Sequence, residues 1–462
     1  MSSRMGYLPN ETPPFGQLIL LGFQHVLTMF PATIFVALLT GFHVSTVLLA
    51  SGISTIVALL LSKWRIGKFI PLFYGSSFSY IAAYLTITQA QYAVAAPDEL
   101  ISVMQGGIVV TGLLNIVVGL VIKAVGKGAV DKVLPPVVTG SVAAVIGFAL
   151  GKAAIDLATG IALGLEEANL TMVFVAIVTL LATVIFSVYL QGRGFIGMLP
   201  VLLGAIVGYF VAWALGLVDF APMAGRLFFE FPNITFPSFS GPLAGTAIFS
   251  IAIMALATIP ESTAHLYQIS LYVDRFAEEQ GKEKYNLDEN IGFNLVLDGI
   301  GDAINGLIGA TAGTNYGENN SLMAITRNYS GPALISAGVI SILVAFVGVL
   351  DGLMRTVPAA VSGGLAIYLF GVIGMQGIAL MQEHKVSMFD PRNLAVGATI
   401  MVVGIGGHIG FPNGLIPIPI FQGVFPSGLP AIATAAVLGI LMNAIFLIFT
   451  PPQVAAEAAA AD

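Results

Sequence analysis

The segment Gly313-Thr314-Asn315-Tyr316-Gly317-Glu318-Asn319-Asn320 places a carboxylate, amides and glycines in a part of the chain that is otherwise suited to lipid. A second carboxylate, Glu261, lies in the apolar segment Ala255 to Leu266 (ALATIPESTAHL). A charged side chain at the centre of a membrane helix costs roughly 2.5–3.5 kcal/mol on insertion scales. Two such carboxylates indicate a site for a polar substrate or a transported proton, so these segments predict a transporter.

Composition indicates a polytopic membrane protein with little room for a soluble domain. The 462 residues are 57% hydrophobic and 9% charged, with a mean hydropathy of +0.95, whereas soluble domains have about 25% charged residues. The absence of cysteine excludes disulfides, thiolate metal ligands and cysteine nucleophiles. No basic cluster occurs, so we expect no nucleic-acid partner. The first apolar run lacks a small-residue cleavage site, so we expect it to remain as a span.

Fourteen apolar runs come close to the roughly 20 residues that a helix needs to cross a bilayer. They cover residues 17–40, 45–62, 69–90, 104–124, 134–155, 170–190, 196–216, 244–272, 287–310, 313–328, 331–352, 357–382, 393–409 and 430–449. An even number of spans puts both termini on one side. If that side is the cytoplasm, only Lys152, Arg226 and Arg355 of the 17 Lys and Arg residues lie outside, as the positive-inside rule favours.

The two halves of the chain share features at a spacing of seven runs. Residues 134–140 (LPPVVTG) resemble residues 357–363 (VPAAVSG), and they begin the fifth and twelfth runs. The third and tenth runs each begin with an extended-looking piece, followed by Ser, Thr or Asn side chains that suit the N-cap of a half-helix. An odd number of spans per half predicts an inverted repeat, and paired interrupted segments indicate where a transporter binds its substrate.

Four motifs follow in order at these runs. They are Gln24-His25 with Phe30-Pro31-Ala32-Thr33, Gly75-Ser76-Ser77-Phe78, Glu261 with His265-Leu266, and Tyr316-Gly317-Glu318-Asn319 through Met323-Ala324-Ile325-Thr326-Arg327. From about Phe15 to Leu447, the chain resembles the nucleobase–ascorbate transporters (nucleobase:cation symporter-2 family), and among them the bacterial uracil–proton symporters.

The resemblance implies an all-α fold of fourteen transmembrane segments in two inverted seven-segment repeats, with short antiparallel strands interrupting segments 3 and 10. It divides the chain into a cytoplasmic N-terminus (1–16), a core domain (17–132 and 244–355), a gate domain (133–243 and 356–450) and a cytoplasmic tail (451–462), which we expect to be disordered. It also implies alternating access between core and gate, a homodimer through the gate domain, and a place in the bacterial plasma membrane.

The implied function is import of uracil, or a closely related nucleobase, coupled to protons. Uracil offers two N–H donors, and the carboxylates of Glu261 and Glu318 are suited to accept one each. Backbone N–H groups near Phe78 and Gly317 would donate to the uracil carbonyls, and the Phe78 ring would pack on the base.

The resemblance implies roles for further residues. Ala32, Ser77 and Tyr316 would line the substrate pocket with those above. His265 and His25 would join Glu261 in handling the coupled proton, since His265 lies four residues after Glu261 on the same helix face. Asn319 and Thr326 would support the site. The alternative for each histidine is a buried ring bonded to the backbone. We interpret Asp298 and Asp302 as structural contacts or as residues nearer the cytoplasm.

The chain also departs from the family pattern, which leaves the substrate open. Pro31 and Ser321 stand where uracil members usually have glycine, and Pro260 and Ser262 flank Glu261 in place of Ala and His. A xanthine or other purine permease is therefore an alternative. An anion transporter of the same fold is a weaker one, because two carboxylates would repel the anion. No nucleophile, metal-ligand spacing or cofactor motif occurs, so we expect no enzyme, metal or cofactor.

Overall fold

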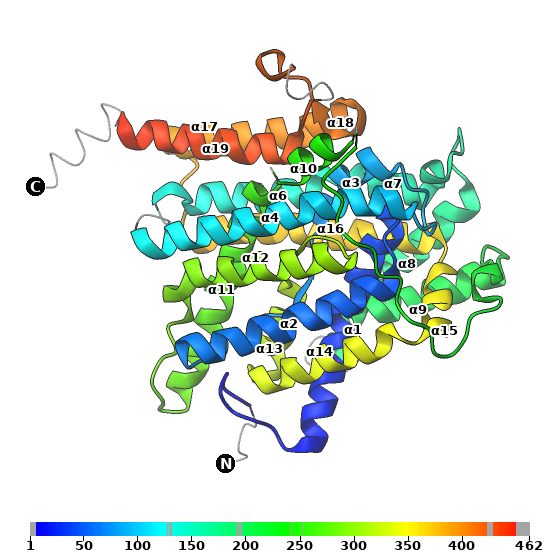
Figure 1. Cartoon of the computed structure of the whole chain (residues 1–462), viewed down its shortest axis with the longest axis horizontal. Coiled ribbons are helices and arrows are strands. Elements are labelled where there is room, and N and C mark those ends of the chain that lie inside the picture. The colour runs from blue at the N-terminus through cyan, green and yellow to red at the C-terminus, as the bar shows by residue number, and fades with distance from the viewer. Residues whose placement is uncertain are drawn as a thin grey trace, which may run out of the picture.

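The computed structural model describes residues 6–126, 128, 132–190, 193, 196–241, 243–252, 254–422 and 428–449. The expected disordered tail 451–462 lies outside these residues. In Figure 1, α1 (Phe15–Thr40) runs across the other long helices, most of which run side by side near one shared direction. This is the arrangement that a bilayer imposes, because a helix satisfies its own backbone hydrogen bonds there.

The helices are α1 (Phe15–Thr40), α2 (Val44–Ile66), α3 (Ile81–Thr88), α4 (Asp98–Val125), α6 (Pro136–Ala149), α7 (Gly151–Thr159), α8 (Leu170–Tyr189), α9 (Pro200–Ala214), α10 (Ala244–Ala252), α11 (Ala255–Glu279), α12 (Ile291–Ile308), α13 (Gly317–Thr326), α14 (Gly331–Ala345), α15 (Gly348–Arg355), α16 (Ala359–Glu383), α17 (Pro391–Met401), α18 (Gly407–Gly410) and α19 (Ala431–Ile448). The strands are β1 (Tyr74–Ser76), β2 (Gly313–Asn315), β3 (Leu415–Ile416) and β4 (Leu429–Pro430). Short helical turns are η1 (Phe78–Tyr80), η2 (Ile161–Leu163), η3 (Ile196–Met198), η4 (Ala221–Met223), η5 (Leu287–Asn290), η6 (Val402–Gly406, a π-turn), η7 (Pro412–Gly414) and η8 (Pro419–Phe421).

Within the described residues, nine helical stretches are long and apolar enough to cross a membrane, and α9 and α14 are shorter apolar helices. The chain is thus a multi-pass integral membrane protein. Four expected runs are divided: the fifth into α6 and α7, the eighth into α10 and α11, the eleventh into α14 and α15, and the thirteenth into α17 and α18 around η6. Helix α11 also continues to Glu279, seven residues past the expected end, because its last turns are polar and leave the apolar run.

Glycines allow the long helices to approach closely, which is how helices associate where lipid removes the hydrophobic driving force. Helix α4 packs along α12, and α2 packs along α14. A Cβ atom on Gly112 of α4 would lie 2.5 Å from the carbonyl oxygen of Gly299 of α12, and one on Gly52 of α2 would lie 2.5 Å from that of Gly338 of α14. Helices α6 and α16 form a third such pair.

The third and tenth runs meet in the middle of the chain's packed helices. β1 pairs antiparallel with β2, with Tyr74 opposite Asn315 and Ser76 opposite Gly313. Each strand leads into a short helix, η1 with α3 on one side and α13 on the other. Asp302 of α12 holds β2, because its carboxylate accepts from the Gly313 N–H at 2.6 Å. The structural role expected for Asp302 is therefore present.

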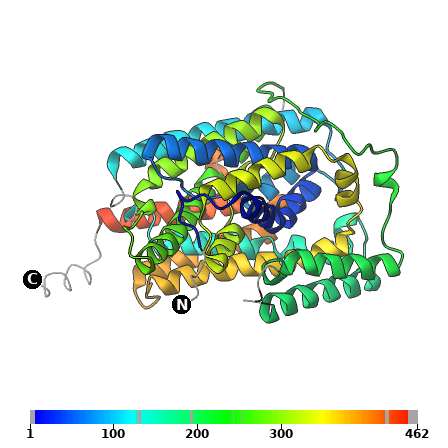
Figure 2. The same ribbon diagram turned by 90° about the horizontal axis from the view of Figure 1, so that it is seen from below.

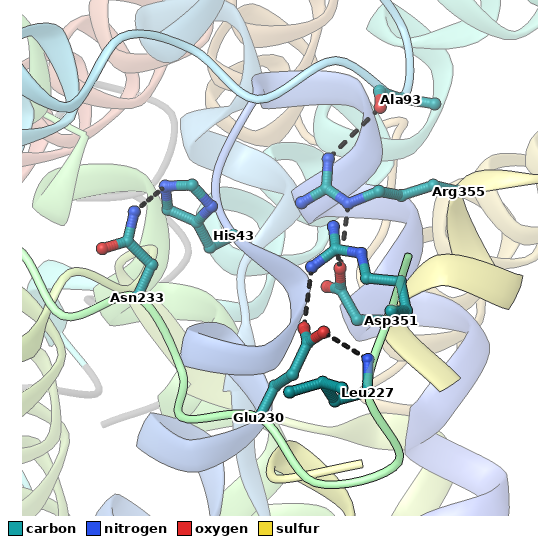
Figure 3. A network of polar contacts seen from close by, with 8 residues as sticks. His43, Ala93, Leu227, Glu230, Asn233, Asp351 and Arg355 are labelled. Atoms are coloured by element: carbon teal, nitrogen blue, oxygen red, sulfur yellow. Dashed lines mark hydrogen bonds and ion pairs between the residues drawn. The ribbon is translucent and has the colours of Figure 1, made fainter. Parts of the chain in front are cut away.

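The connection from α9 to α10 crosses one end of the molecule, drawn in green in Figure 2. A polar network holds it there (Figure 3). Arg226 pairs with Glu230 at 2.9 Å and with Asp351 of α15 at 3.1 Å, and Arg355 pairs with the same Asp351 at 3.1 Å. The Leu227 N–H and the Arg226 guanidinium hold the pKa of Glu230 below its ordinary value of 4.5.

Candidate functional site

A cavity of about 1110 Å³ lies where the strand pair meets α1, α11, α13 and α16. Its wall contains six of the residues expected at the substrate site: Phe78, Glu261, His265, Tyr316, Gly317 and Glu318. The cavity also reaches the charged ends of α11 and α16, at Arg275, Lys284 and Glu383. The site is thus open toward the end of the molecule that the charge pattern assigns to the cytoplasm.

The two carboxylates face this cavity from different elements. Glu261 lies within α11, and its Oε2 accepts from Ser79 Oγ of η1 at 3.5 Å. Glu318 lies in the first turn of α13, where the positive end of the helix dipole favours an acidic side chain. In the part of the chain that the structure describes, no Lys or Arg forms an ion pair with either group. Both therefore remain available to accept hydrogen bonds from a ligand.

Tyr316 joins the strand pair to α1. Its hydroxyl donates to the Ser76 carbonyl at 3.0 Å and lies 2.9 Å from Thr33 Oγ1. A Cβ on Gly75 would lie 2.4 Å from the Tyr316 ring, so glycine at this position makes room for the ring. The hydroxyl is thus bonded within the protein, and Tyr316 itself lies in the cavity wall.

Phe78 in the cavity wall belongs to a cluster of three aromatic side chains. Phe78 packs edge-on against Phe370 of α16, with ring centroids 5.4 Å apart, and both contact Phe35 of α1. At the start of α16, the Tyr92 hydroxyl lies 2.5 Å from Ser362 Oγ and donates to the Val357 carbonyl at 3.1 Å. These contacts join the segment after α3 to the start of α16.

Five expected site residues are not in the wall of the cavity. His25 is buried in α1 and bonded to Asn319, Ala32 is buried in the same helix, and Ser77 caps η1 by accepting from the Ser79 N–H at 3.3 Å. Thr326 donates to the Leu322 carbonyl at the far end of α13. Ser77 also hydrogen-bonds to Glu261, which borders the site, whereas Asn319 bonds to His25, which does not.

Other residues at the cavity were not expected there from the sequence. Pro31, Gln268, Asn315, Ser321, Tyr368 and Gln376 contribute to the wall. Asn315 contacts His265, and Ser262 contacts Asp298. Ser262, which departs from the family pattern, is therefore part of a buried network. Gln376 could have been predicted from the sequence, because it is a polar residue in the largely apolar run 357–382, and polar residues inside spans are costly and usually functional.

No group of three or more His, Asp or Glu side chains among the described residues is arranged to hold a metal ion. Beside the strand pair, the cavity wall offers the carboxylates of Glu261 and Glu318, the imidazole of His265, and amide and hydroxyl groups. These groups suit hydrogen bonding to a small polar ring that carries N–H donors.

Comparisons with known proteins identify the family to which the chain belongs. A family model described as "Permease family" matches residues 16–412. The chain is 35% identical over 438 residues to a uracil permease of Bacillus caldolyticus, covering 94% of this chain and 93% of the relative. It is 32% identical over 459 residues to a uracil permease of Escherichia coli K12, covering 98% and 97%.

Two solved structures share the fold at low identity. The transmembrane domain of the cyanobacterial bicarbonate transporter BicA has a TM-score of 0.57 at 15% identity, covering 95% of this chain and 99% of that one. SLC26A9 has a TM-score of 0.64 at 11% identity, covering 94% and 65%. The fold and the buried polar cavity define a multi-pass membrane permease. The chain belongs to the nucleobase–ascorbate transporter family.

Proposed function

We propose that the protein imports uracil, or a closely related nucleobase, together with protons. The observation that carries this proposal is the pair of carboxylates, Glu261 and Glu318, facing one cavity beside the Phe78 ring without a cationic partner among the described residues. Each carboxylate accepts one N–H of the planar base, in charge-assisted hydrogen bonds. The uracil permeases among the relatives support this substrate.

The coupled proton is carried at the same site. Two carboxylates at one cavity of low dielectric repel each other when both are ionised, so a proton on one of them accompanies the neutral base. Glu261 is the proposed carrier, because His265 lies one helical turn away and both border the cavity. Coupling through a group that also binds the substrate links proton movement to base movement.

Transport proceeds by alternating access between a core domain (17–132 and 244–355) and a gate domain (133–243 and 356–450). The helix pairs support an inverted repeat of fourteen segments. Helices α4 and α12 are segments 4 and 9, and the segments seven positions away, 11 and 2, are α14 and α2, which also pack together. Likewise, β1 with β2 and α6 with α16 each join two segments that are seven positions apart. The cavity's charged mouth and the Tyr92–Ser362 closure support an inward-open state with cytoplasmic termini.

The test is uptake of labelled uracil into proteoliposomes under an imposed inward proton gradient, with unlabelled nucleobases as competitors. We expect gradient-driven uptake that uracil blocks and xanthine does not. Glu261→Gln and Glu318→Gln should each weaken uracil binding by about tenfold or more, the effect of losing a charged acceptor. Glu166→Gln, on an exposed loop, is the matched control. Wild-type uptake by both cavity variants would refute the site, and xanthine-blocked uptake would indicate a purine permease.

A further inference from the structure

We infer that Asn315 and Asp298 are positioning residues that hold His265 as one tautomer, with Nδ1 protonated and Nε2 presented to the cavity as an acceptor. The inference deepens the proposed function and rests on it only for the identity of the ligand that Nε2 meets. It is carried by a chain of buried hydrogen bonds behind the cavity wall.

The chain of contacts crosses three elements. Asn315 at the end of β2 places its Oδ1 2.9 Å from His265 Nδ1 of α11. The other end of the same amide donates to Ser262 Oγ at 2.9 Å and to Asp298 Oδ1 of α12 at 3.4 Å. Ser262 in turn donates to Asp298 Oδ2, and Asn294 of α12 donates to Ser262 at 2.8 Å.

The carboxylate decides which way the Asn315 amide points. Both oxygens of Asp298 accept in these contacts, and Ser262, whose one proton is used in its bond to Asp298, accepts from its other neighbours. The NH₂ group of Asn315 must therefore face Asp298 and Ser262, because the reversed amide would set oxygen against oxygen. Its Oδ1 then faces His265, and an oxygen acceptor there requires a proton on Nδ1.

A neutral imidazole with a proton on Nδ1 has its lone pair on Nε2. A Cβ atom on Gly317 would lie 2.9 Å from this Nε2, so the acceptor lies against the start of α13, one residue before Glu318. His265 and Gly317 both border the cavity. Nε2 therefore accepts a hydrogen bond from an N–H group of a heteroaromatic ligand, or it binds a proton. A ligand edge that carries only acceptors is disfavoured there.

Two isosteric or matched variants separate positioning from packing. Asp298→Asn keeps the size of the side chain but removes the charge that orients the Asn315 amide. Asn294→Ala removes a hydrogen bond to the same Ser262, and Asn294 itself bonds to Ser262 and Tyr74 and not to His265 within the described residues. The direct variant, Asn315→Leu, removes the amide itself; if it fails to fold, Asp298→Asn still tests the inference.

The experiment is ¹⁵N NMR of the full chain with labelled histidine, reconstituted in lipid without substrate. The protein has five histidines, and His265→Gln identifies the signals of interest. We expect a protonated Nδ1 and an unprotonated Nε2 in the wild type and in Asn294→Ala, and a mixture or reversal of the tautomers in Asp298→Asn. A wild-type ring with its proton on Nε2, or an unchanged tautomer in Asp298→Asn, would overturn the inference.

Uptake assays supply the second readout. Asp298→Asn should raise the KM for uracil about tenfold, as expected for one lost hydrogen bond to the ligand, with a smaller change in maximal rate. A reversed tautomer with an unchanged KM would overturn the positioning role. Because the NMR is recorded without substrate, a wild-type protein that fails to transport uracil would refute the proposed function alone.

Discussion

The side-chain amide of Asn319 donates to both Nδ1 and the main-chain carbonyl of His25, at 3.0 and 3.2 Å. Asn319 directly follows Glu318, so this double contact fixes the first turn of α13 to α1. His25 is therefore bonded to a structural partner and does not lie in the cavity wall. Its Nδ1 accepts a hydrogen bond, whereas the Nδ1 of His265 donates one.

Replacing Asn319 by alanine should destabilise the protein. The variant leaves a buried ring nitrogen and a carbonyl oxygen without their donor, which costs about 1–3 kcal/mol. Thermal unfolding in detergent should show a lower Tm than the wild type. Ser321→Ala in the same helix is the control: it loses only a bond to the Gly317 carbonyl of its own helix, and we expect a change within about 0.5 kcal/mol. Equal Tm values for both variants would contradict the proposed link between α1 and α13.

Cross-linking the outer closure should stop transport. The chain has no native cysteine, so Tyr92→Cys with Ser362→Cys gives a unique thiol pair in place of the Tyr92–Ser362 contact. A bifunctional methanethiosulfonate should join the core segment to α16, hold the outer side closed and reduce uptake to background, and a reductant should restore it.

The Tyr209–Thr356 contact provides a matched pair for this experiment. It has the same tyrosine–hydroxyl chemistry at 2.8 Å, but both residues belong to the proposed gate domain. Cross-linking cysteines at 209 and 356 should leave uptake close to that of the unlinked variant. Full transport with 92 and 362 cross-linked would show that the two groups of helices need not separate there.

Alanine at Gly317 should impair binding more than folding. Gly317 has no positive φ, so its backbone accepts alanine, but the added Cβ would lie 2.9 Å from His265 Nε2. We expect uracil affinity to fall roughly tenfold, equivalent to ~1.4 kcal/mol, in equilibrium binding measurements. Gly371→Ala in α16, where nothing lies within 4 Å of the new Cβ, should bind normally. Equal affinities of the two variants would argue against a ligand beside His265.

Acid should loosen the loop around Glu230. The pKa of this carboxyl is lowered in the folded protein by the Leu227 N–H and by Arg226. The stabilisation is therefore complete above the ordinary glutamate pKa and is lost as pH falls through the lowered folded value. Hydrogen exchange at the Leu227 amide, corrected for intrinsic rates, should accelerate across that acidic range. Glu230→Gln should show the faster exchange at neutral pH already, and identical profiles for both proteins would contradict this role.

Several features could be read from the sequence because they depend on local composition. Length and hydropathy predict membrane helices, since the bilayer sets how many apolar residues a span needs. The polar interruptions at Gly75-Ser76-Ser77 and Gly313-Thr314-Asn315 mark the positions of the two strands. Glu261, His265 and Glu318 stand out because polar groups are expensive in an apolar run.

Other features depend on groups that are distant in sequence and meet only in the folded chain. The breaks at α10–α11 and α14–α15 were missed because apolar composition continues across both of them. His25 and His265 look alike as polar residues in spans, yet the first faces Asn319 across 294 positions and the second faces Asn315 and the cavity. Ser262 was expected only as a departure, and its contact with Asp298 gives it a role.

The sequence by itself therefore determined the membrane helices, the interrupted segments and the identity of the two carboxylates, because hydropathy and the cost of burying polar groups act residue by residue. The tertiary structure alone decided which polar groups share the cavity, which are bonded away from it, and which ring nitrogen of His265 faces the site. Hydrogen bonds are short and directional, so these outcomes depend on ångström-scale placement of helices that packing between distant segments sets.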